Sequence, residues 1–279
     1  MMQRKIAFIG GGNMAAAIIS GLIASGYDKK LITVSAPSEK TRTRFSQNVG
    51  VLATADNVKA ASEADVVVLA VKPQLMREVC DGLKGITDID QKLFLTIAAG
   101  TAVQLYRDIL SPNLKIIRIM PNTPSLVGEG VSGLFADDKT SAQDKAFTTD
   151  LMSAVGKVVW VEKETEINHV IAIAGSAPGY LFLFLEAMQE KAVSLGFQPE
   201  QARELILQTA KGVVALAEYE QDLGFNQLRA NVTSKGGTTF EALNVFDKKG
   251  LKPTVDEAMQ AAIDRAQSME IEFSLAKKS

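Results

Sequence analysis

Five strand-length apolar runs recur through the first part of the chain, and helical patterning separates each run from the next. The runs are Ile6–Ile9, Leu31–Ser35, Val66–Val71, Leu93–Ile97 and Lys115–Met120. Strands that are apolar on both sides are typical of parallel sheets covered by helices on both faces. The pattern therefore predicts a doubly wound α/β domain with a mostly parallel sheet. Two further runs, Val131–Leu134 and Val158–Val161, are expected to close the far edge of that sheet.

Strand-length apolar runs end near Glu164. After it, the sequence contains residues that are typical of helix starts and ends. Ser176 and Pro178 are typical of a helix start, Gly196 of its end, and Pro199 of a second start. A chain of 279 residues is long enough for about two domains. We expect a doubly wound α/β domain over residues 1–163 and an all-helical domain over residues 164–279.

The segment Tyr180–Leu185 is apolar around more than one face of a helix, so it must be buried. Its expected place is the centre of the helical domain or a subunit interface. It belongs to the longest uncharged run, residues 170–185, which contains Gly175, Pro178 and Gly179. That run is expected to be too short and too interrupted to cross a membrane.

The charge balance and the rare residue types exclude several classes of function. Lys and Arg number 30 against 32 Asp and Glu, a net charge of −2 that disfavours nucleic acid as a partner. One cysteine and one histidine permit neither an internal disulfide nor a tetrahedral zinc site. The apolar stretch after Lys5 is too short for a secretion signal. We expect metal-free chemistry in the cytoplasm.

A glycine-rich turn directly follows the first apolar run. It reads Gly10-Gly11-Gly12-Asn13-Met14-Ala15, which matches the dinucleotide-binding fingerprint with Ala in the third small position. Gly10 permits the tight turn, Gly12 lets a pyrophosphate approach the backbone, and the following helix offers its N–H groups to phosphate. This predicts a dinucleotide site that includes Gly10 to Met14.

The end of the second run favours NADPH over NADH. NAD-specific sites usually have an acid there, but this chain reads Ser35-Ala36-Pro37-Ser38, and Asp28 precedes the strand. Ser35 and Ser38 could donate to a 2′-phosphate, with Lys40 and Arg42 adding positive charge. The alternative is that Ser38 only caps a helix and that both cations are solvated. NADH remains a weaker alternative cofactor.

Two short turns follow later strands. Ala70-Val71-Lys72-Pro73 ends the third run and Ala98-Ala99-Gly100 ends the fourth. Ligands of open parallel sheets bind beyond the carboxyl ends of the strands, so a nicotinamide ribose could approach these turns. The structural alternative is that each turn is simply a tight connection.

The stretch Ser234–Glu241 is the most informative part of the second half. Two glycines precede a helix, and Thr238 with Glu241 has the spacing of a capping box, which leaves first-turn N–H groups for a carboxylate. The hydroxyl of Thr239 is then free for a second substrate atom. The alternative is an ordinary glycine loop before a helix. His169 and Cys80 are expected to be packed side chains rather than catalytic groups.

Taken together, six strings resemble pyrroline-5-carboxylate reductase, the family of the last step of proline synthesis. They are IGGGNMA at 9–15, AVKPQ at 70–74, IAAGT at 97–101, MPNTP at 120–124, GSAPGY at 175–180 and SKGGTT at 234–239. They occur in the family's order. One departure is Lys235, which stands where the family usually has proline and so lowers the expected rigidity of the loop.

The resemblance implies a Rossmann domain followed by a helical domain that forms a homodimer, with dimers assembling further into rings. It implies cofactor contacts at Gly10, Gly11, Gly12, Asn13, Met14, Ser35, Pro37, Asn57, Ala70, Val71, Lys72, Pro73, Ala98, Ala99 and Asn231. It implies substrate contacts at Ser234, Gly236, Gly237, Thr238, Thr239 and Glu164, with Thr239 as the catalytic residue that orients the ring nitrogen.

The chemistry agrees with this assignment. A cyclic imine accepts hydride most readily as its protonated iminium, so positioning matters more than a strong base. A β-hydroxyacid dehydrogenase is the nearest enzymatic alternative, but its catalytic lysine has no counterpart in GSAPGYLFLF. A non-catalytic NADPH sensor is the alternative from another class, and an imine-dependent NADPH oxidation assay would separate the two.

Overall fold

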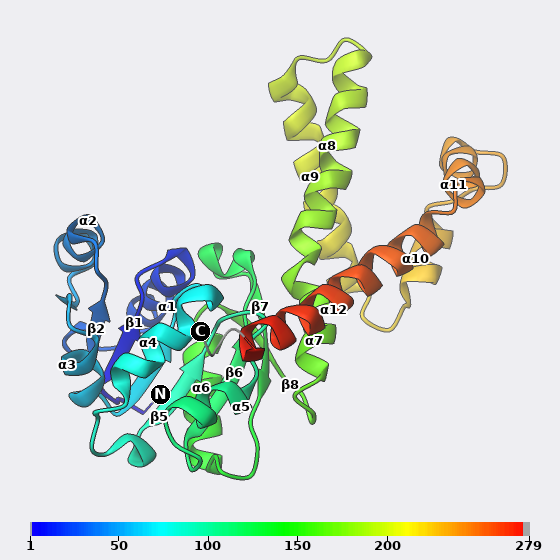
Figure 1. Cartoon of the computed structure of the whole chain (residues 1–279). Helices are drawn as coiled ribbons and strands as arrows, with labels where there is room; N and C mark the ends of the chain where they lie inside the picture. The colour runs from blue at the N-terminus through cyan, green and yellow to red at the C-terminus, as the bar shows by residue number, and fades with distance from the viewer. Residues whose placement is uncertain (1, 276–279) are drawn as a thin grey trace. The chain divides into compact units, whose positions relative to one another are not determined.

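The computed structural model describes residues 2–275 (Figure 1). Eight strands form a single sheet. They are β1 (Ile6–Ile9), β2 (Ile32–Ser35), β3 (Leu52–Thr54), β4 (Val66–Leu69), β5 (Leu93–Thr96), β6 (Lys115–Met120), β7 (Gly130–Phe135) and β8 (Gly156–Trp160). Their order across the sheet is β3-β2-β1-β4-β5-β6-β7-β8. The chain therefore reverses its direction of winding between β1 and β4, which is where a doubly wound sheet opens its ligand crevice.

The sheet is parallel except at one step. Ile6 pairs with Ile32 on one side and with Val66 on the other, and β7 runs antiparallel to β6. The doubly wound, mostly parallel sheet predicted from the apolar runs is confirmed. β7 and β8 form the far edge as expected. β3 is an additional short edge strand that the apolar runs did not predict.

Alternate residues of the strands face two separate cores, which explains their continuous apolar runs. Ile6 and Phe8 of β1 pack into one core and Ala7 and Ile9 into the other, and all four are buried. The first core is covered by α1 (Asn13–Ala24) and α6 (Ala142–Ser153). The second is covered by α3 (Asn57–Ser62), α4 (Met76–Leu83) and α5 (Val103–Ile109).

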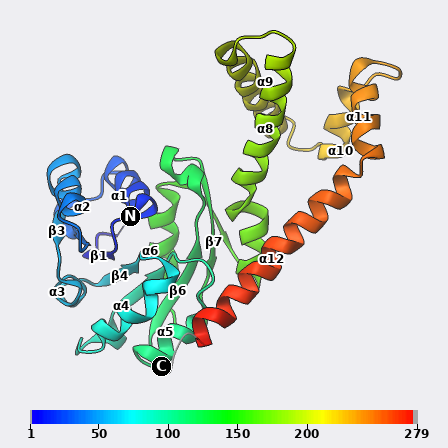
Figure 2. The same ribbon diagram turned by 45° about the horizontal axis from the view of Figure 1, so that its top comes forward.

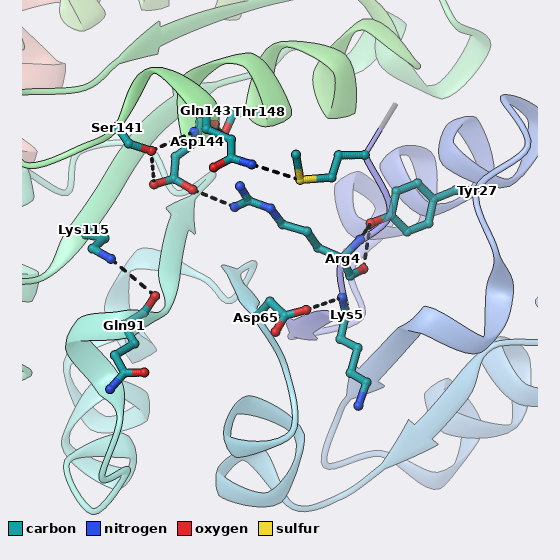
Figure 3. A network of polar contacts seen from close by, with 11 residues as sticks. Arg4, Lys5, Tyr27, Asp65, Gln91, Lys115, Ser141, Gln143, Asp144 and Thr148 are labelled. Atoms are coloured by element: carbon teal, nitrogen blue, oxygen red, sulfur yellow. Dashed lines mark hydrogen bonds and ion pairs between the residues drawn. The ribbon is translucent and has the colours of Figure 1, made fainter.

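A polar network closes the amino end of the sheet (Figure 3). Arg4 Nη1 lies 2.6 Å from Asp144 Oδ1, Tyr27 donates to the Arg4 carbonyl oxygen, and Lys5 N–H donates to Asp65. A hollow of about 470 Å³ lies beside this network. Because it lies at the amino ends of the strands, it is on the opposite edge from the predicted dinucleotide site.

The second part of the chain is helical. It contains α7 (Glu166–Val170), a π-helical turn (Ile171–Gly175), α8 (Ala177–Ser194), α9 (Pro199–Tyr219), α10 (Phe225–Asn231), α11 (Thr238–Lys248) and α12 (Leu251–Leu275). Figures 1 and 2 both show α8 and α9 side by side. The predicted helix starts at Ser176–Pro178 and at Pro199 are confirmed to within a residue or two.

By compactness the chain divides differently from the expected boundary after residue 163. One unit comprises residues 1–178 and 261–279, and the other residues 179–260. The expected boundary marks where strands give way to helices. Compactness instead groups α7 and the last part of α12 with the sheet, because their contacts are with it. The boundary after residue 163 stays a prediction about where the helical domain begins.

The apolar belt on α8 corrects two expectations. Leu181, Phe182 and Leu183 are about two-thirds exposed, so the belt does not form the centre of the helical unit. Within the described chain, α7, the π-helical turn and α8 follow one another over Glu166–Ser194, with a bend at Ser176. This stretch is long enough to span a membrane and contains an 18-residue window with a mean hydropathy of 1.6. Gly175 is the last residue of the π-helical turn. Pro178 is tolerated because it stands in the first turn of α8, where its missing N–H costs no intrahelical hydrogen bond. A partner surface remains the expected cover for this belt.

Candidate active site

The glycine turn packs tightly on the end of β4. Gly10 has φ +106°, and a Cβ there would lie 2.5 Å from the carbonyl oxygen of Ala70. Gly10 N–H donates to the Ser35 carbonyl oxygen at 2.8 Å. Three expected cofactor segments, at Gly10, Ser35 and Ala70, therefore meet at the carboxyl ends of β1, β2 and β4.

Gly12 leaves space for an anion at the start of α1. A Cβ on Gly12 would meet nothing within 4 Å, and as the N-cap residue it provides no side-chain cap. The first turn of α1 contains no acid. The N–H groups of Asn13 and Met14 therefore remain available, and the helix dipole favours a negative charge there. These features fit the pyrophosphate of a dinucleotide, as the sequence predicts.

Ser35 and Asn57 meet at the end of β2. The Ser35 hydroxyl donates to Asn57 Oδ1 at 2.6 Å, and Asn57 is the first residue of α3. Ser38 caps α2 (Glu39–Thr43) by accepting from Thr41 N–H at 3.5 Å, while Lys40 is exposed. Asp28 lies at the other end of β2, where it caps a short 3₁₀ turn. It is therefore remote from the ribose position, as expected.

Two arginines approach this end of the sheet. Arg42 Nη1 donates to the carbonyl oxygens of Ala36 and Pro37 at 2.8 and 2.6 Å, so Arg42 is not the solvated cation of the alternative interpretation. Arg44 Nη2 donates to the Gly11 carbonyl oxygen at 2.7 Å, and its guanidinium lies over the Phe45 ring. Arg44 Nε is buried and has no hydrogen-bond partner within the described chain.

Arg44 belongs to none of the motifs that predict the cofactor site from sequence. The π-helical turn Arg44–Val49, which continues α2, brings the residue back onto the glycine turn. A Cβ on Gly11 would meet Thr41 Cγ2 at 2.6 Å and Phe45 at 2.8 Å, so this segment packs directly on the glycine turn. The only sequence signal was a second arginine shortly after Arg42.

The Ala98-Ala99-Gly100 turn lies over a buried hydrogen-bond network. Tyr106 OH donates to Thr101 Oγ1 and lies 2.5 Å from Thr96 Oγ1, while the Thr101 hydroxyl donates to the Ala98 carbonyl oxygen. Burial raises the pKa of Tyr106, so the phenol keeps its proton. The turn is thus fixed from inside the domain. The AVKP turn, in contrast, leads from β4 into a 3₁₀ turn at Pro73–Leu75.

Glu164 takes part in an ion cluster. Its Oε1 lies 3.1 Å from Arg118 Nη1 and accepts the N–H of Val103 at 2.7 Å, at the start of α5. Arg118 Nη1 also lies 2.6 Å from Glu270 Oε1. About a quarter of the Glu164 side chain is exposed, so the carboxylate reaches the surface of the sheet domain close to the Ala98–Thr101 turn. Neither Arg118 nor Glu270 was identified from the sequence.

The predicted substrate loop begins α11 with a different cap from the one expected. Gly237 is the N-cap residue, it makes no side-chain cap bond, and Thr238 is already the first helical residue. The expected capping box of Thr238 and Glu241 is therefore wrong. Gly236, at φ +71°, turns the chain one residue earlier than a cap at Thr238 would require. First-turn N–H groups are still available, because no side chain occupies them.

Ser234, Gly236 and Gly237 lie in one tight loop, and Thr238 and Thr239 follow as the first two residues of α11. Gly237 N–H donates to the Ser234 carbonyl oxygen, and a Cβ on Gly237 would lie 2.4 Å from Ser234 Oγ. Thr238 is exposed and Thr239 is half-buried. Among the described residues, neither threonine hydroxyl has a hydrogen-bond partner. Lys235 is exposed in the same loop.

The remaining candidates are placed as follows. Asn231 ends α10, in the same unit as the loop, and accepts from Gln227 at 2.9 Å. His169 is exposed rather than packed, because it faces away from the buried Ile167–Asn168 side of α7. Cys80 is buried as expected, and burial raises the pKa of its thiol to about 12, so it is unreactive.

Two family models match separate parts of this chain. Residues 164–269 match a family model described as pyrroline-5-carboxylate reductase dimerisation, and residues 5–100 match one described as NADP oxidoreductase, coenzyme F420-dependent. A pyrroline-5-carboxylate reductase of Vibrio alginolyticus is 52% identical over 97% of this chain and 99% of its own length.

Solved structures lead to the same family. A pyrroline-5-carboxylate reductase from Coxiella burnetii is 41% identical with a TM-score of 0.89, and the match covers 96% of this chain and 99% of that one. The Plasmodium falciparum pyrroline carboxylate reductase with NADP bound is 29% identical with a TM-score of 0.87, covering 97% and 99%. The chain therefore belongs to the pyrroline-5-carboxylate reductase family.

Proposed function

We propose that this chain reduces 1-pyrroline-5-carboxylate to L-proline with NADPH. The observation that carries the proposal is a pair of helix starts whose N-cap glycines leave the first turn without a side-chain cap. Gly12 precedes α1 and Gly237 precedes α11. Each is suited to an anion, the first to the phosphates of a dinucleotide and the second to a small carboxylate.

The cofactor end of the proposal rests on the carboxyl edge of the sheet. Gly10, Gly11 and Gly12 with Asn13 and Met14 would hold the pyrophosphate. Ser35, Pro37 and Asn57 would meet the adenosine ribose, with Arg42 and Arg44 as the nearby positive charges. The turns Ala70–Pro73 and Ala98–Ala99 would meet the nicotinamide half, and Asn231 is the expected contact from the helical domain. When bound, NADPH supplies the hydride that the imine carbon accepts.

The substrate end rests on the α11 loop. The Thr238 N–H and the Ser234 side chain would bind the carboxylate beside the backbone of Gly237, whose own N–H donates to the Ser234 carbonyl oxygen. Gly236 gives the loop its left-handed turn. The Thr239 hydroxyl would orient the ring nitrogen, since it has no other partner in the described chain. Glu164 would line the pocket, with its carboxylate held by Arg118 and Val103 N–H. No strong base is needed for a protonated imine.

The helical domain, expected over residues 164–279, is proposed to form the homodimer, and dimers are proposed to assemble into larger rings. The exposed apolar belt of α8 supports self-association, because large exposed apolar patches mark interaction surfaces. A match to a dimerisation model over the same residues favours a partner subunit, rather than a membrane, as the cover for Glu166–Ser194. We propose a cytoplasmic location and no nucleic-acid partner.

The test is imine-dependent oxidation of NADPH, measured with NADPH and with NADH. Purified protein should oxidise NADPH only when 1-pyrroline-5-carboxylate is present and should form proline, with a lower kcat/KM for NADH. A protein that binds NADPH tightly without turnover would be a sensor. Oxidation of a β-hydroxyacid in the reverse direction, without imine reduction, would indicate the dehydrogenase instead.

A further inference from the structure

Arg118 of β6 joins distant parts of the chain. Only 1% of its surface is exposed, and its guanidinium serves two carboxylates, Glu164 after β8 and Glu270 on α12. Nη2 also donates to Asn168 on α7 at 3.3 Å. A buried guanidinium needs such partners, because an uncompensated buried charge is strongly destabilising. The pairing therefore fixes where this part of α12 lies on the sheet domain.

The residues beside Glu270 lie directly on the Ala98-Ala99-Gly100 turn. A Cβ on Gly100 would lie 2.7 Å from Met269 Cβ and 3.3 Å from Phe273. Gly100 is buried and has φ +69°. Another side chain would find neither space nor a favourable backbone conformation there. One face of α12 thus closes over this turn from outside the domain.

The inner side of the same turn is fixed by Thr101 and Tyr106, through the buried hydrogen bonds to the Ala98 carbonyl oxygen and to Thr96. The turn is therefore held between a hydrogen-bond network below and an α12 side chain above. Arg77 makes a further contact with α12, since its Nη2 donates to the Ser274 carbonyl oxygen.

We propose that Glu270 and Met269 are positioning residues for the nicotinamide half of the cofactor. The ion pair between Glu270 and Arg118 fixes the position of the last part of α12 on the sheet domain. Met269 then packs against the backbone of Ala98 to Gly100 and holds it in the conformation that binds the cofactor. This inference rests on the proposed function, which assigns Ala98 and Ala99 to the cofactor. The adenosine half is bound elsewhere, at the glycine turn and the end of β2.

That division provides the test. Glu270→Gln removes the charge but keeps the shape, and Glu164 still neutralises Arg118, so the variant should fold. The matched control is Glu272→Gln on the same helix, whose exposed carboxylate pairs with Arg265. Calorimetry would measure the Kd of NADPH and of 2′,5′-ADP, which carries only the adenosine half, for both variants. Met269→Ala keeps Cβ but removes the rest of the side chain that lies against the turn, including Cε, which is 3.1 Å from the position of a Cβ on Gly100.

We expect Glu270→Gln and Met269→Ala to raise the Kd of NADPH at least fivefold while the Kd of 2′,5′-ADP stays within twofold. Glu272→Gln should change neither. Equal weakening of both ligands, or no weakening of either, by Glu270→Gln would overturn the inference. Failure of the proposed function has a different signature, because the wild-type protein would then show no imine-dependent NADPH oxidation.

Discussion

The Ser35 hydroxyl and the Asn57 side chain are joined by a 2.6 Å hydrogen bond at the end of β2. Both residues are expected to bind cofactor, yet they are separated along the chain by α2 and β3. The bond orients Asn57 at the start of α3 and buries Ser35. It fixes the edge against which the adenosine ribose would lie, and the proposed preference for NADPH over NADH can be tested at that edge.

Replacing Ser35 by Asp should reverse that preference. The new carboxylate would lie beside the 2′-phosphate and repel it. Two unit charges of the same sign 4 Å apart repel by about 4 kcal/mol at an effective dielectric constant of 20. We expect kcat/KM with NADPH to fall at least about tenfold and that with NADH to hold or rise. Asn57 can turn its amide nitrogen toward the new carboxylate, so the fold should survive.

The control for this change is Ser46→Asp, which alters net charge equally on the exposed side of the Arg44–Val49 turn. It should leave both kcat/KM values within about twofold, since a solvent-exposed charge interacts weakly with one farther away. Equal losses with NADPH and NADH in Ser35→Asp would mean that the 2′-phosphate is bound elsewhere.

Arg44 should support both cofactors alike. Its guanidinium donates to the Gly11 carbonyl oxygen, so Arg44→Ala loosens the turn that holds the pyrophosphate common to NADPH and NADH. A hydrogen bond from a charged donor contributes about 1.5–3 kcal/mol, which predicts a rise of at least about tenfold in the Kd of each. Lys30→Ala is the control, since Lys30 is exposed at the opposite end of β2. A loss confined to NADPH would show instead that Arg44 binds the 2′-phosphate.

Assembly should depend on the apolar belt of α8. The Phe184 ring lies 6.1 Å from that of Phe246 and is 45% exposed on the single chain. Phe184→Asp would bury an unpaired charge in the proposed subunit interface, and such a charge is costly. Light scattering should therefore give a lower mass than for wild type. Leu52→Asp, on the exposed edge strand β3, should leave the mass unchanged. Wild-type protein that is monomeric at micromolar concentration would contradict the proposal.

Acid should destabilise the sheet domain through Asp144. Burial alone raises the pKa of this carboxyl, but hydrogen bonds from Arg4 and Ser141 outweigh burial and hold the pKa below its ordinary value. A group whose folded pKa is depressed contributes stability above its unfolded pKa of about 3.9 and loses it as pH falls through the folded value. The free energy of unfolding in urea should therefore decrease below about pH 4.

The variant Asp144→Asn isolates this contribution. It should be less stable than wild type at pH 6, by about 1.5–3 kcal/mol for the lost charged hydrogen bond, and should lose less stability than wild type on acidification. The exposed Asp138→Asn should behave like wild type in both respects. Parallel pH profiles for wild type and Asp144→Asn would show that other carboxylates account for the acid sensitivity.

The sheet was predictable from sequence because its central strands are buried on both faces. Val66–Leu69 and Leu93–Thr96 are apolar at nearly every position. Such strands can be identified without an alternating apolar and polar pattern and without knowledge of the neighbouring strand. β3 was not predicted because it has only three residues and lies at the edge of the sheet, where Leu52 is 58% exposed. The antiparallel step at β7 escaped because apolar runs carry no information on strand direction.

The site was predictable where its residues are contiguous, as in the glycine turn and the Ser234–Thr239 loop. Arg44 depends on a π-helical turn, and Glu270 depends on how α12 packs on Arg118, so neither has a local signal. The cap of α11 illustrates a third limit. Residue type favours Thr238, but the left-handed backbone of Gly236 starts the helix one residue earlier, with Gly237 as cap.

That corrected cap changes what is expected of the two threonines. A capping threonine contributes typically about 1 kcal/mol, but Thr238 is already inside the helix, and its hydroxyl has no partner in the described chain. Thr238→Ala should therefore keep the melting temperature of wild type. Its backbone N–H, which is the proposed carboxylate donor, is also retained, so the KM for the imine should change little.

Thr239→Ala should keep stability but lose activity. The Thr239 hydroxyl is the proposed partner of the ring nitrogen, and a hydrogen bond to a charged group contributes about 1.5–3 kcal/mol, or about tenfold to a hundredfold in kcat/KM. NADPH affinity should be unaffected, because the cofactor is bound by other residues. Turnover, KM, NADPH binding and melting temperature would be measured for both variants. Full activity in Thr239→Ala together with a loss of activity in Thr238→Ala would show that Thr238, not Thr239, contacts the ring nitrogen. A lower melting temperature in Thr238→Ala alone would show that Thr238 caps the helix after all.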